Sequence, residues 1–177
     1  MAGDWRGDPK IQSMTTKKVL ITGSSAVGKT ALCNRFICGA FREGRESTVG
    51  VKVGKKELEI QGQKVALLLW DIIGEPSQEK VPRTYFLGAS AVVYVFDLSR
   101  PGTRKNMEAD LAIIRRSLPG CLVRIVGNKK DLLSPEELQA LASESRAALF
   151  TSAKTGDNVD GLFLGIGQEL MGETAGI

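Results

Sequence analysis

The sequence predicts an α/β fold in which a mostly parallel, six-stranded sheet contains one antiparallel hairpin strand and carries helices on both faces. Short apolar segments of strand length alternate with segments whose apolar residues recur at helical spacing. Residues 91–96 form a continuous apolar run, which is typical of a parallel strand buried on both faces. In such folds ligands bind at the carboxyl ends of the strands. We therefore search for functional residues directly after each expected strand.

The first such segment is residues 23–30, GSSAVGKT, which fits the phosphate-binding pattern G-x-x-x-x-G-K-[ST]. It lies between an expected strand at residues 18–22 and an expected helix at residues 31–36. Gly23 allows a tight turn, and Gly28 lets the backbone approach phosphate oxygens. Successive N–H groups then form an anion nest at a helix N-terminus. The alternative interpretation is a glycine-rich turn that matches the pattern by chance. At ordinary glycine usage, a chance match is expected in about 1% of chains of this size.

Two side chains at the end of this loop have the chemistry of a nucleotide site. Lys29 supplies a positive charge for β- and γ-phosphates, and the Thr30 hydroxyl is a suitable ligand for Mg²⁺. The expected nucleotide contacts of the loop are Gly23, Ser24, Ser25, Ala26, Val27, Gly28, Lys29, Thr30 and Ala31.

The next elements form a hairpin. Residues 39–48 are a polar linker, residues 50–60 alternate weakly as a strand, and residues 64–70 form an apolar strand. Gln61-Gly62 between them is a turn signal, so the two strands are expected to pair antiparallel. Residues 71–83 are rich in Gly, Pro and charge and are expected to form a loop.

The remaining chain alternates helices and strands. Strands are expected at residues 91–96, 122–126 and 148–150. Ser134 followed by Pro135 and two glutamates is a helix start, with a capping Ser and Pro at the first helical position. Two further helices are predicted from apolar residues at helical spacing, namely Met107, Leu111, Ile114 and Leu118, and Val159, Leu162, Phe163, Ile166 and Leu170.

The residues after the last two expected strands indicate which base is bound. Asn128-Lys129-Lys130-Asp131 follows one strand, and Ser152-Ala153-Lys154 follows the other. The Asp131 carboxylate is suited to accept two N–H bonds from guanine, whereas adenine offers no such donor pair. A backbone N–H in the second loop is suited to bind guanine O6. When Asn-x-x-Asp occurs alone, it is usually a turn. Here it follows a phosphate loop in the chain, and together residues 128–131 and 152–154 predict a guanine-binding pocket.

Composition limits the other possibilities. The chain contains no histidine, which excludes a His-based triad, general base or metal site. Its net charge of +4 is too small to indicate nucleic-acid or membrane binding. Three cysteines without paired spacing predict reduced thiols and a cytoplasmic protein. We expect residues 1–16 to be a flexible tail, residues 17–171 to be one nucleotide-binding domain, and residues 172–177 to be a short tail with no lipidation cysteine.

Taken in order, these motifs resemble those of a small GTPase of the Ras superfamily, a P-loop NTPase, nearest to its Rab and Ras branches. The resemblance covers about residues 17–170 and all five motif regions of the family. It implies that GTP or GDP and Mg²⁺ are bound. It also implies that Phe41 stacks against guanine and that Lys129 lies along it. Thr48 and Asp71 would hold Mg²⁺, the Gly74 N–H would meet the γ-phosphate, and the Ala153 N–H would bind O6. The alternatives are a core aromatic for Phe41 and turn formation for Thr48 and Gly74.

Several residues depart from the family pattern. Ala26 stands where Gly is frequent, Ile72-Ile73 replaces Thr-Ala, and Glu75 stands where the family has the Gln that orients the attacking water. Pro76 disfavours the helical conformation for Glu75. Ala26 lies in the phosphate loop, whereas residues 72–76 lie in the segment that the resemblance identifies as the second switch loop.

Arg45 is a second candidate catalytic residue. It lies three residues before Thr48, at the spacing of the built-in arginine in the α subunits of heterotrimeric G proteins, which the chain resembles at this point. An arginine there would stabilise charge on the γ-phosphate. The alternative is an exposed arginine in a loop that needs solubility.

The resulting expectation is a monomeric, cytoplasmic GTP-binding switch with slow hydrolysis and without a direct membrane anchor. Residues 41–50 and 71–83 would present a surface to an effector, with an exchange factor and a GTPase-activating protein as further partners. The expected catalytic residues are Lys29, Arg45, Thr48 and Glu75. Alternatives left open are a nucleotide-holding scaffold without useful hydrolysis and the GTP-binding domain of a larger protein. An ATP-dependent kinase or ATPase is a third alternative, against which Asp131 argues.

Overall fold

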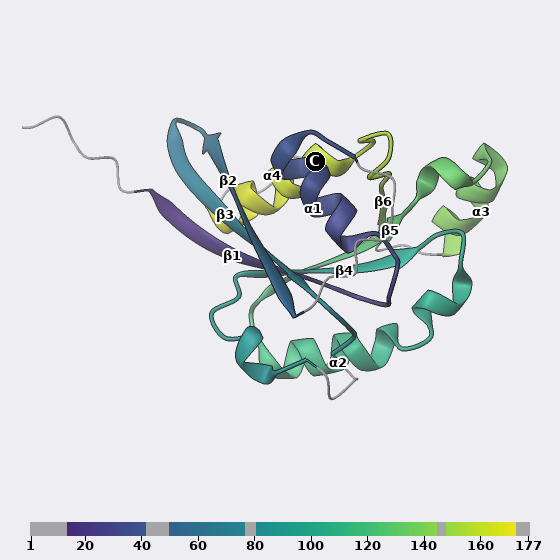
Figure 1. Ribbon diagram of the computed structural model, residues 1–177, viewed down its shortest axis with the longest axis horizontal. Helices are drawn as coiled ribbons and strands as arrows, with labels where there is room; N and C mark the ends of the chain where they lie inside the picture. Colours follow the sequence, from purple (N-terminus) through teal and green to yellow (C-terminus); the bar gives the residue numbers. More distant parts are fainter. Residues whose placement is uncertain (1–13, 42–49, 77–80, 145–147, 173–177) are drawn as a thin grey trace, which may run out of the picture.

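The computed structural model describes residues 14–41, 50–76, 81–144 and 148–172 (Figure 1). Six strands form one sheet in the order β2-β3-β1-β4-β5-β6. The strands are β1 (Thr15–Thr22), β2 (Val51–Ile60), β3 (Gln63–Ile72), β4 (Ala91–Asp97), β5 (Leu122–Asn128) and β6 (Ala148–Phe150). The helices are α1 (Lys29–Cys38), α2 (Met107–Ser117), α3 (Pro135–Glu144) and α4 (Val159–Leu170), and short 3₁₀ turns are η1 (Arg83–Tyr85), η2 (Pro101–Arg104) and η3 (Lys130–Leu132).

The predicted fold class is confirmed. β2 and β3 pair antiparallel around the two-residue turn Gln61-Gly62, and both turn residues have positive φ, 46° and 75°. All other neighbouring strands pair parallel. The parallel arrangement places the ends of β1, β4 and β5 at one edge of the sheet, where the loops that follow them meet.

Two apolar cores lie on opposite faces of the sheet because side chains alternate along each strand. α1 and α4 cover one face and α2 covers the other (Figure 1). Phe36 of α1 stacks on Phe163 of α4 with ring centroids 4.5 Å apart. The α1–α4 core includes Val19, Ile21, Leu32, Phe36, Val93, Val95, Phe163 and Ile166, and the α2 core includes Leu20, Ile72, Val92, Tyr94, Leu111 and Ile114.

Tyr94 joins the central strand β4 to α2 through a buried polar contact. Its hydroxyl donates to Asp110 Oδ2 at 2.8 Å, and both side chains are fully buried. Burial and the hydrogen bond to this carboxylate raise the pKa of Tyr94, so the phenol remains protonated and continues to donate. The contact fixes α2, and with it the residues that precede α2, relative to the sheet.

Most element positions agree with the sequence prediction, but several boundaries differ. Asp71 and Ile72 were expected in the loop at residues 71–83, whereas they are the last residues of β3. Thr15 and Thr16 were assigned to a flexible tail, whereas both belong to β1 and pair with Val65 and Ala66. Backbone pairing to β3 extends the strand through these polar residues.

Residues 1–13 and 173–177 lie outside the described residues. The capping of α3 is confirmed, since Glu137 N–H donates to Ser134 Oγ and Ser134 N–H donates to Glu137 Oε2.

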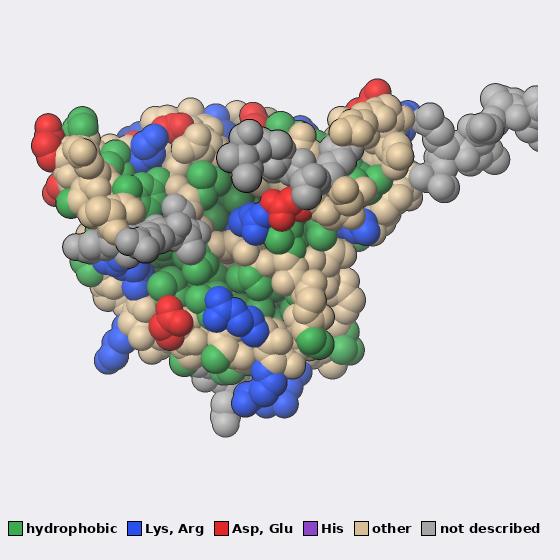
Figure 2. Space-filling view, turned by 180° about the vertical axis from the view of Figure 1, so that it is seen from behind, with side chains coloured by type: hydrophobic (Ala, Val, Ile, Leu, Met, Phe, Trp, Pro, Cys, Tyr) green, Lys and Arg blue, Asp and Glu red, His purple; other side chains and the backbone are tan. Residues whose placement is uncertain are grey.

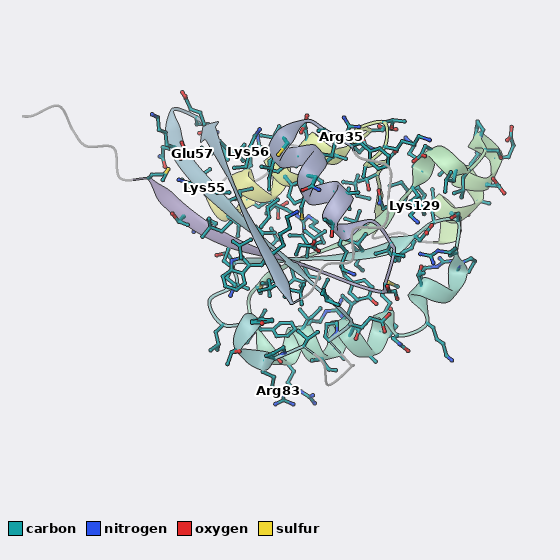
Figure 3. The ribbon with its side chains drawn as sticks, viewed as in Figure 1. Arg35, Lys55, Lys56, Glu57, Arg83 and Lys129 are labelled. Carbon is teal, nitrogen blue, oxygen red and sulfur yellow. The ribbon has the colours of Figure 1, made fainter. Side chains whose placement is uncertain are left out.

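Charged side chains of both signs are interspersed on the face shown in Figure 2, around a hollow where hydrophobic side chains reach the surface. Lys55 and Glu57 form an ion pair of 2.7 Å on β2, far from Lys129 (Figure 3). Among the described residues, no helix combines the length and apolar character needed to cross a membrane.

Replacing Tyr94 with Phe removes the hydroxyl that donates to Asp110 without changing the shape of the ring. We expect the free energy of unfolding to fall by about 1–3 kcal/mol, because a buried carboxylate loses a donor. Urea unfolding measures the change, and Tyr85→Phe, at a half-buried position, is the matched control. Equal stability of Tyr94→Phe and wild type would show that the contact contributes little.

Candidate functional site

The phosphate loop connects the end of β1 at Thr22 to the start of α1 at Lys29, and its two motif glycines are required by close backbone contacts. Gly23 has φ 131°, and a Cβ there would lie 2.0 Å from the Val95 carbonyl oxygen. Gly28 has φ 97°, and a Cβ there would lie 2.3 Å from Asn128 Nδ2. The loop is therefore packed against the ends of β4 and β5.

Lys29 folds back over this loop. Its Nζ donates to the carbonyl oxygens of Gly23 at 2.7 Å and Ser24 at 2.8 Å. Burial lowers the pKa of Lys29, while the negative charges of Asp71 and Glu75 act in the opposite direction. The ammonium group is thus held at the loop whose backbone N–H groups form the predicted anion nest.

Thr30 and Asp71 meet beside Lys29. The Thr30 hydroxyl donates to Asp71 Oδ2, and Asp71 is buried at the end of β3. No group of three or more His, Cys, Asp or Glu side chains gathers as a metal cage in the described part of the chain. One hydroxyl and one carboxylate fit Mg²⁺, which retains water and phosphate oxygens as its other ligands. Thr30 and Asp71 are thus in contact, and their binding of Mg²⁺ stays a prediction.

Asn128 connects the phosphate loop to the predicted base-binding loops. Its buried side chain donates to the Val27 carbonyl at 3.0 Å. Its Oδ1 accepts from the Thr151 hydroxyl at 3.2 Å and from the Ala153 N–H at 3.1 Å. Because this N–H is already engaged with Asn128, its contact with guanine O6 stays a prediction.

Asp131 is exposed and oriented by Ser152. The Ser152 hydroxyl donates to Asp131 Oδ1 at 2.5 Å, and the same hydroxyl oxygen accepts from the Thr155 N–H at 3.1 Å. The two segments that are predicted from the sequence to bind guanine are thus in contact where they follow β5 and β6.

Lys129 and Arg100 hold the outer side of the phosphate loop. Lys129 Nζ and Arg100 Nη2 each donate to the Ala26 carbonyl at 2.9 Å, and both side chains pair with Asp97 Oδ2 at 2.7 Å. Burial alone would raise the pKa of Asp97, but hydrogen bonds from Lys129, Ser99 and Arg100 outweigh it and lower the pKa. Sequence reasoning missed Asp97 and Arg100, although Asp97, a charged residue at the end of the buried strand β4, was a usable signal.

Arg35 is a further residue that sequence reasoning missed. From α1 its guanidinium donates to the carbonyl oxygens of Ala153 at 2.8 Å and Lys154, so it holds the loop after β6. Figure 3 shows Arg35 and Lys129 toward the same end of the sheet. No motif marks Arg35, because the contact joins positions 118 residues apart.

Glu75 lies at the start of the second predicted switch loop, and its side chain is buried. Its Oε1 accepts from the Ser24 hydroxyl, and its Oε2 accepts from Asn106 Nδ2 at 2.6 Å. The neighbouring Gly74 carbonyl accepts from the Thr22 hydroxyl at 3.1 Å. Asn106, which directly precedes α2, was not predicted.

Some predicted site residues do not join this arrangement. Phe41 is half-buried and packs against the α1–α4 core, as the alternative interpretation expected, and its contact with guanine stays a prediction. Arg45 and Thr48 lie in residues 42–49, outside the described residues, as does part of the second loop at residues 77–80.

Comparison with known proteins agrees with this geometry. The model of the Ras family matches residues 18–172. The chain belongs to the Ras family. Ras-related protein Rab-4B from Rattus norvegicus, Homo sapiens and Mus musculus is 35% identical over 155 residues, which cover 83% of this chain and 72% of each relative. Ras-family proteins are small GTPases that bind GTP and GDP with Mg²⁺ and work with effectors, exchange factors and GTPase-activating proteins.

Replacing Asp131 with Asn tests the base assignment of this Ras-family site. The amide oxygen is able to keep the Ser152 bond, while the amide NH₂ faces a donor on guanine and a carbonyl on xanthine. We expect GTP binding to weaken about 100-fold and xanthosine triphosphate binding to improve. Competition binding with GTP, ATP and xanthosine triphosphate measures both, with Asp157→Asn as the control. Equal affinity of wild type for ATP and GTP would overturn the guanine assignment.

Replacing Lys29 with Ala removes the positive charge from the phosphate loop. We expect GTP and GDP affinities to fall about 10- to 100-fold, because hydrogen bonds to a charged group are lost. Titration calorimetry measures the affinities, circular dichroism checks folding, and Lys64→Ala is the control at an exposed position. A folded Lys29→Ala protein with wild-type affinities would contradict the loop assignment.

Proposed function

We propose that this chain is a guanine-nucleotide switch that hydrolyses GTP slowly. The observation that carries the proposal is the continuity of the site. Asn128 bonds to the phosphate loop on one side and to the loop after β6 on the other, while Ser152 orients Asp131. A phosphate cradle and a carboxylate suited to guanine thus share one edge of the sheet.

Each part of the site has a defined role in this proposal. Lys29 and the N–H groups of residues 23–30 bind the phosphates, and Asp131 binds the N1 and N2 donors of guanine. Thr30, Asp71 and Thr48 would hold Mg²⁺. When bound, Mg²⁺ neutralises charge on the β- and γ-phosphates. Arg45 is proposed from the sequence as a further positive charge for the γ-phosphate.

Slow hydrolysis follows from Glu75. A glutamine at this position offers a donor and an acceptor, whereas an ionised glutamate offers only acceptors and repels a phosphate. One oxygen of this carboxylate accepts a hydrogen bond from Ser24 and the other accepts one from Asn106. These bonds support a role for Glu75 other than orienting water.

Switching is proposed to act through residues 41–50 and 71–83. A γ-phosphate with Mg²⁺ would order both segments, and hydrolysis would release them. The ordered segments would form the effector surface of a monomer, with an exchange factor and a GTPase-activating protein acting at the same site. Cys33, Cys38 and Cys121 are unpaired thiols, which supports the proposal of a cytoplasmic protein.

The second candidate is a GTP- or GDP-binding scaffold without useful hydrolysis. The same engaged carboxylate of Glu75 favours it, since a buried acid held by two donors is poorly suited to activate water. The two candidates differ in single-turnover hydrolysis and agree in nucleotide binding.

A single-turnover assay with GTP tests hydrolysis. We expect wild type to be no faster than about 10⁻⁴ s⁻¹, the unaided rate of small GTPases, and Glu75→Gln to be faster because the charge is lost and a donor is gained. Glu108→Gln, at an exposed position on α2, is the control. A Glu75→Gln protein slower than wild type would show that the carboxylate is itself catalytic. No turnover in either protein would favour the scaffold.

A further inference from the structure

Glu75 connects three parts of the chain that are distant in sequence. Ser24 belongs to the phosphate loop, Asn106 directly precedes α2, and both donate to the carboxylate of Glu75 in the second switch loop. The Ser24 hydroxyl also lies 3.1 Å from the Thr103 carbonyl oxygen in η2. Glu75 is only 5% exposed, so a charged side chain is buried between the switch loop and its neighbours. Burying a carboxylate is unfavourable unless donors satisfy it, and here both oxygens are satisfied.

The residues around Glu75 on the α2 side are held by the sheet. Asp110 of α2 accepts from Tyr94 of β4, and the Asp110 N–H donates to the Asn106 carbonyl at 2.9 Å. Thr103 Oγ1 accepts from the Asp97 N–H at 3.0 Å. These contacts hold Asn106 in place, so the donor of the Asn106–Glu75 hydrogen bond does not move with the switch loop. Glu75 lies in the loop that moves in the proposed function, and its movement would break this hydrogen bond.

The charge of Glu75 makes this contact sensitive to the nucleotide. Together with Asp71, Glu75 attracts the ammonium of Lys29, the group proposed to bind the β- and γ-phosphates. A γ-phosphate adds negative charge close to this ammonium, and like charges in a poorly hydrated site repel each other. GDP lacks that phosphate. The arrangement in which Ser24 and Asn106 hold Glu75 is thus more compatible with GDP than with GTP.

We propose that Ser24, Glu75 and Asn106 form a latch that makes the chain prefer GDP over GTP, with Asn106 as the positioning residue. The proposal rests on the proposed guanine-nucleotide binding. While the latch is closed, the start of the second switch loop is tied to the phosphate loop and to α2. GTP binds more weakly because its γ-phosphate must open the latch or tolerate the nearby carboxylate.

The test compares affinities for GDP and for guanosine 5′-(β,γ-imido)triphosphate, both with Mg²⁺, on the full chain. We expect Asn106→Ala to lower the preference for GDP about five- to tenfold, because a hydrogen bond to a charged group in the GDP form is lost. Glu75→Gln removes the charge and is expected to act in the same direction. Lys105→Ala and Glu108→Gln, exposed neighbours of Asn106, are expected to leave the preference unchanged.

A double-mutant cycle separates a latch from a general structural role. If Asn106 acts through Glu75, Asn106→Ala has no effect on the nucleotide preference in a Glu75→Ala background. An equal effect in both backgrounds, or equal weakening of both nucleotides, would overturn the latch. Asn106→Ser, whose hydroxyl is too short to reach Glu75, replaces Asn106→Ala if the latter does not fold. Failure of wild type to bind either nucleotide would reject the proposed function instead.

Discussion

The site depends on one buried amide, Asn128. A primary amide both donates and accepts, and Asn128 uses both abilities: it donates to the phosphate loop and accepts from the loop after β6. An aspartate would lack the donor and a leucine would leave buried backbone groups unpaired, at about 1–3 kcal/mol each. The close approach of Asn128 to the loop requires Gly28, since a Cβ there would lie 2.3 Å from its Nδ2. The two loops that are proposed to bind the phosphates and the base are therefore positioned by the same side chain.

The phosphate loop is prepared for anions by how its carbonyl groups are used. Lys29 occupies the carbonyls of Gly23 and Ser24, while Lys129 and Arg100 occupy that of Ala26. These hydrogen bonds place three positively charged groups at the loop that is proposed to bind the phosphates. Ala26 has φ 59°, a conformation that is uncommon for residues other than glycine. The two cations on its carbonyl stabilise that conformation.

The sequence was sufficient for features with a local cause. Strands and helices follow apolar periodicity, the hairpin follows Gln61-Gly62, and the phosphate loop follows its glycines and Lys29. The pairing of Thr15 and Thr16 with β3 was missed because backbone hydrogen bonds require no apolar side chain. Arg35, Arg100 and Asn106 were missed for another reason. Each acts across a long sequence separation through a carbonyl or a carboxylate, and such contacts leave no spacing pattern in the chain.

The exchange of Gln for Glu at position 75 links two properties that are usually considered separately. An ionised carboxylate that accepts from Ser24 and Asn106 has no donor to offer a γ-phosphate, and its charge also disfavours a nearby γ-phosphate. Slow hydrolysis and preference for GDP would thus have one cause. For a switch these effects oppose each other. Slow hydrolysis lengthens the lifetime of the GTP-bound protein, whereas the latch lowers the fraction of the protein that binds GTP. The lifetime of the GTP form would then depend on a partner that separates Glu75 from Asn106, and such a partner must bind the open form more tightly than the latched one.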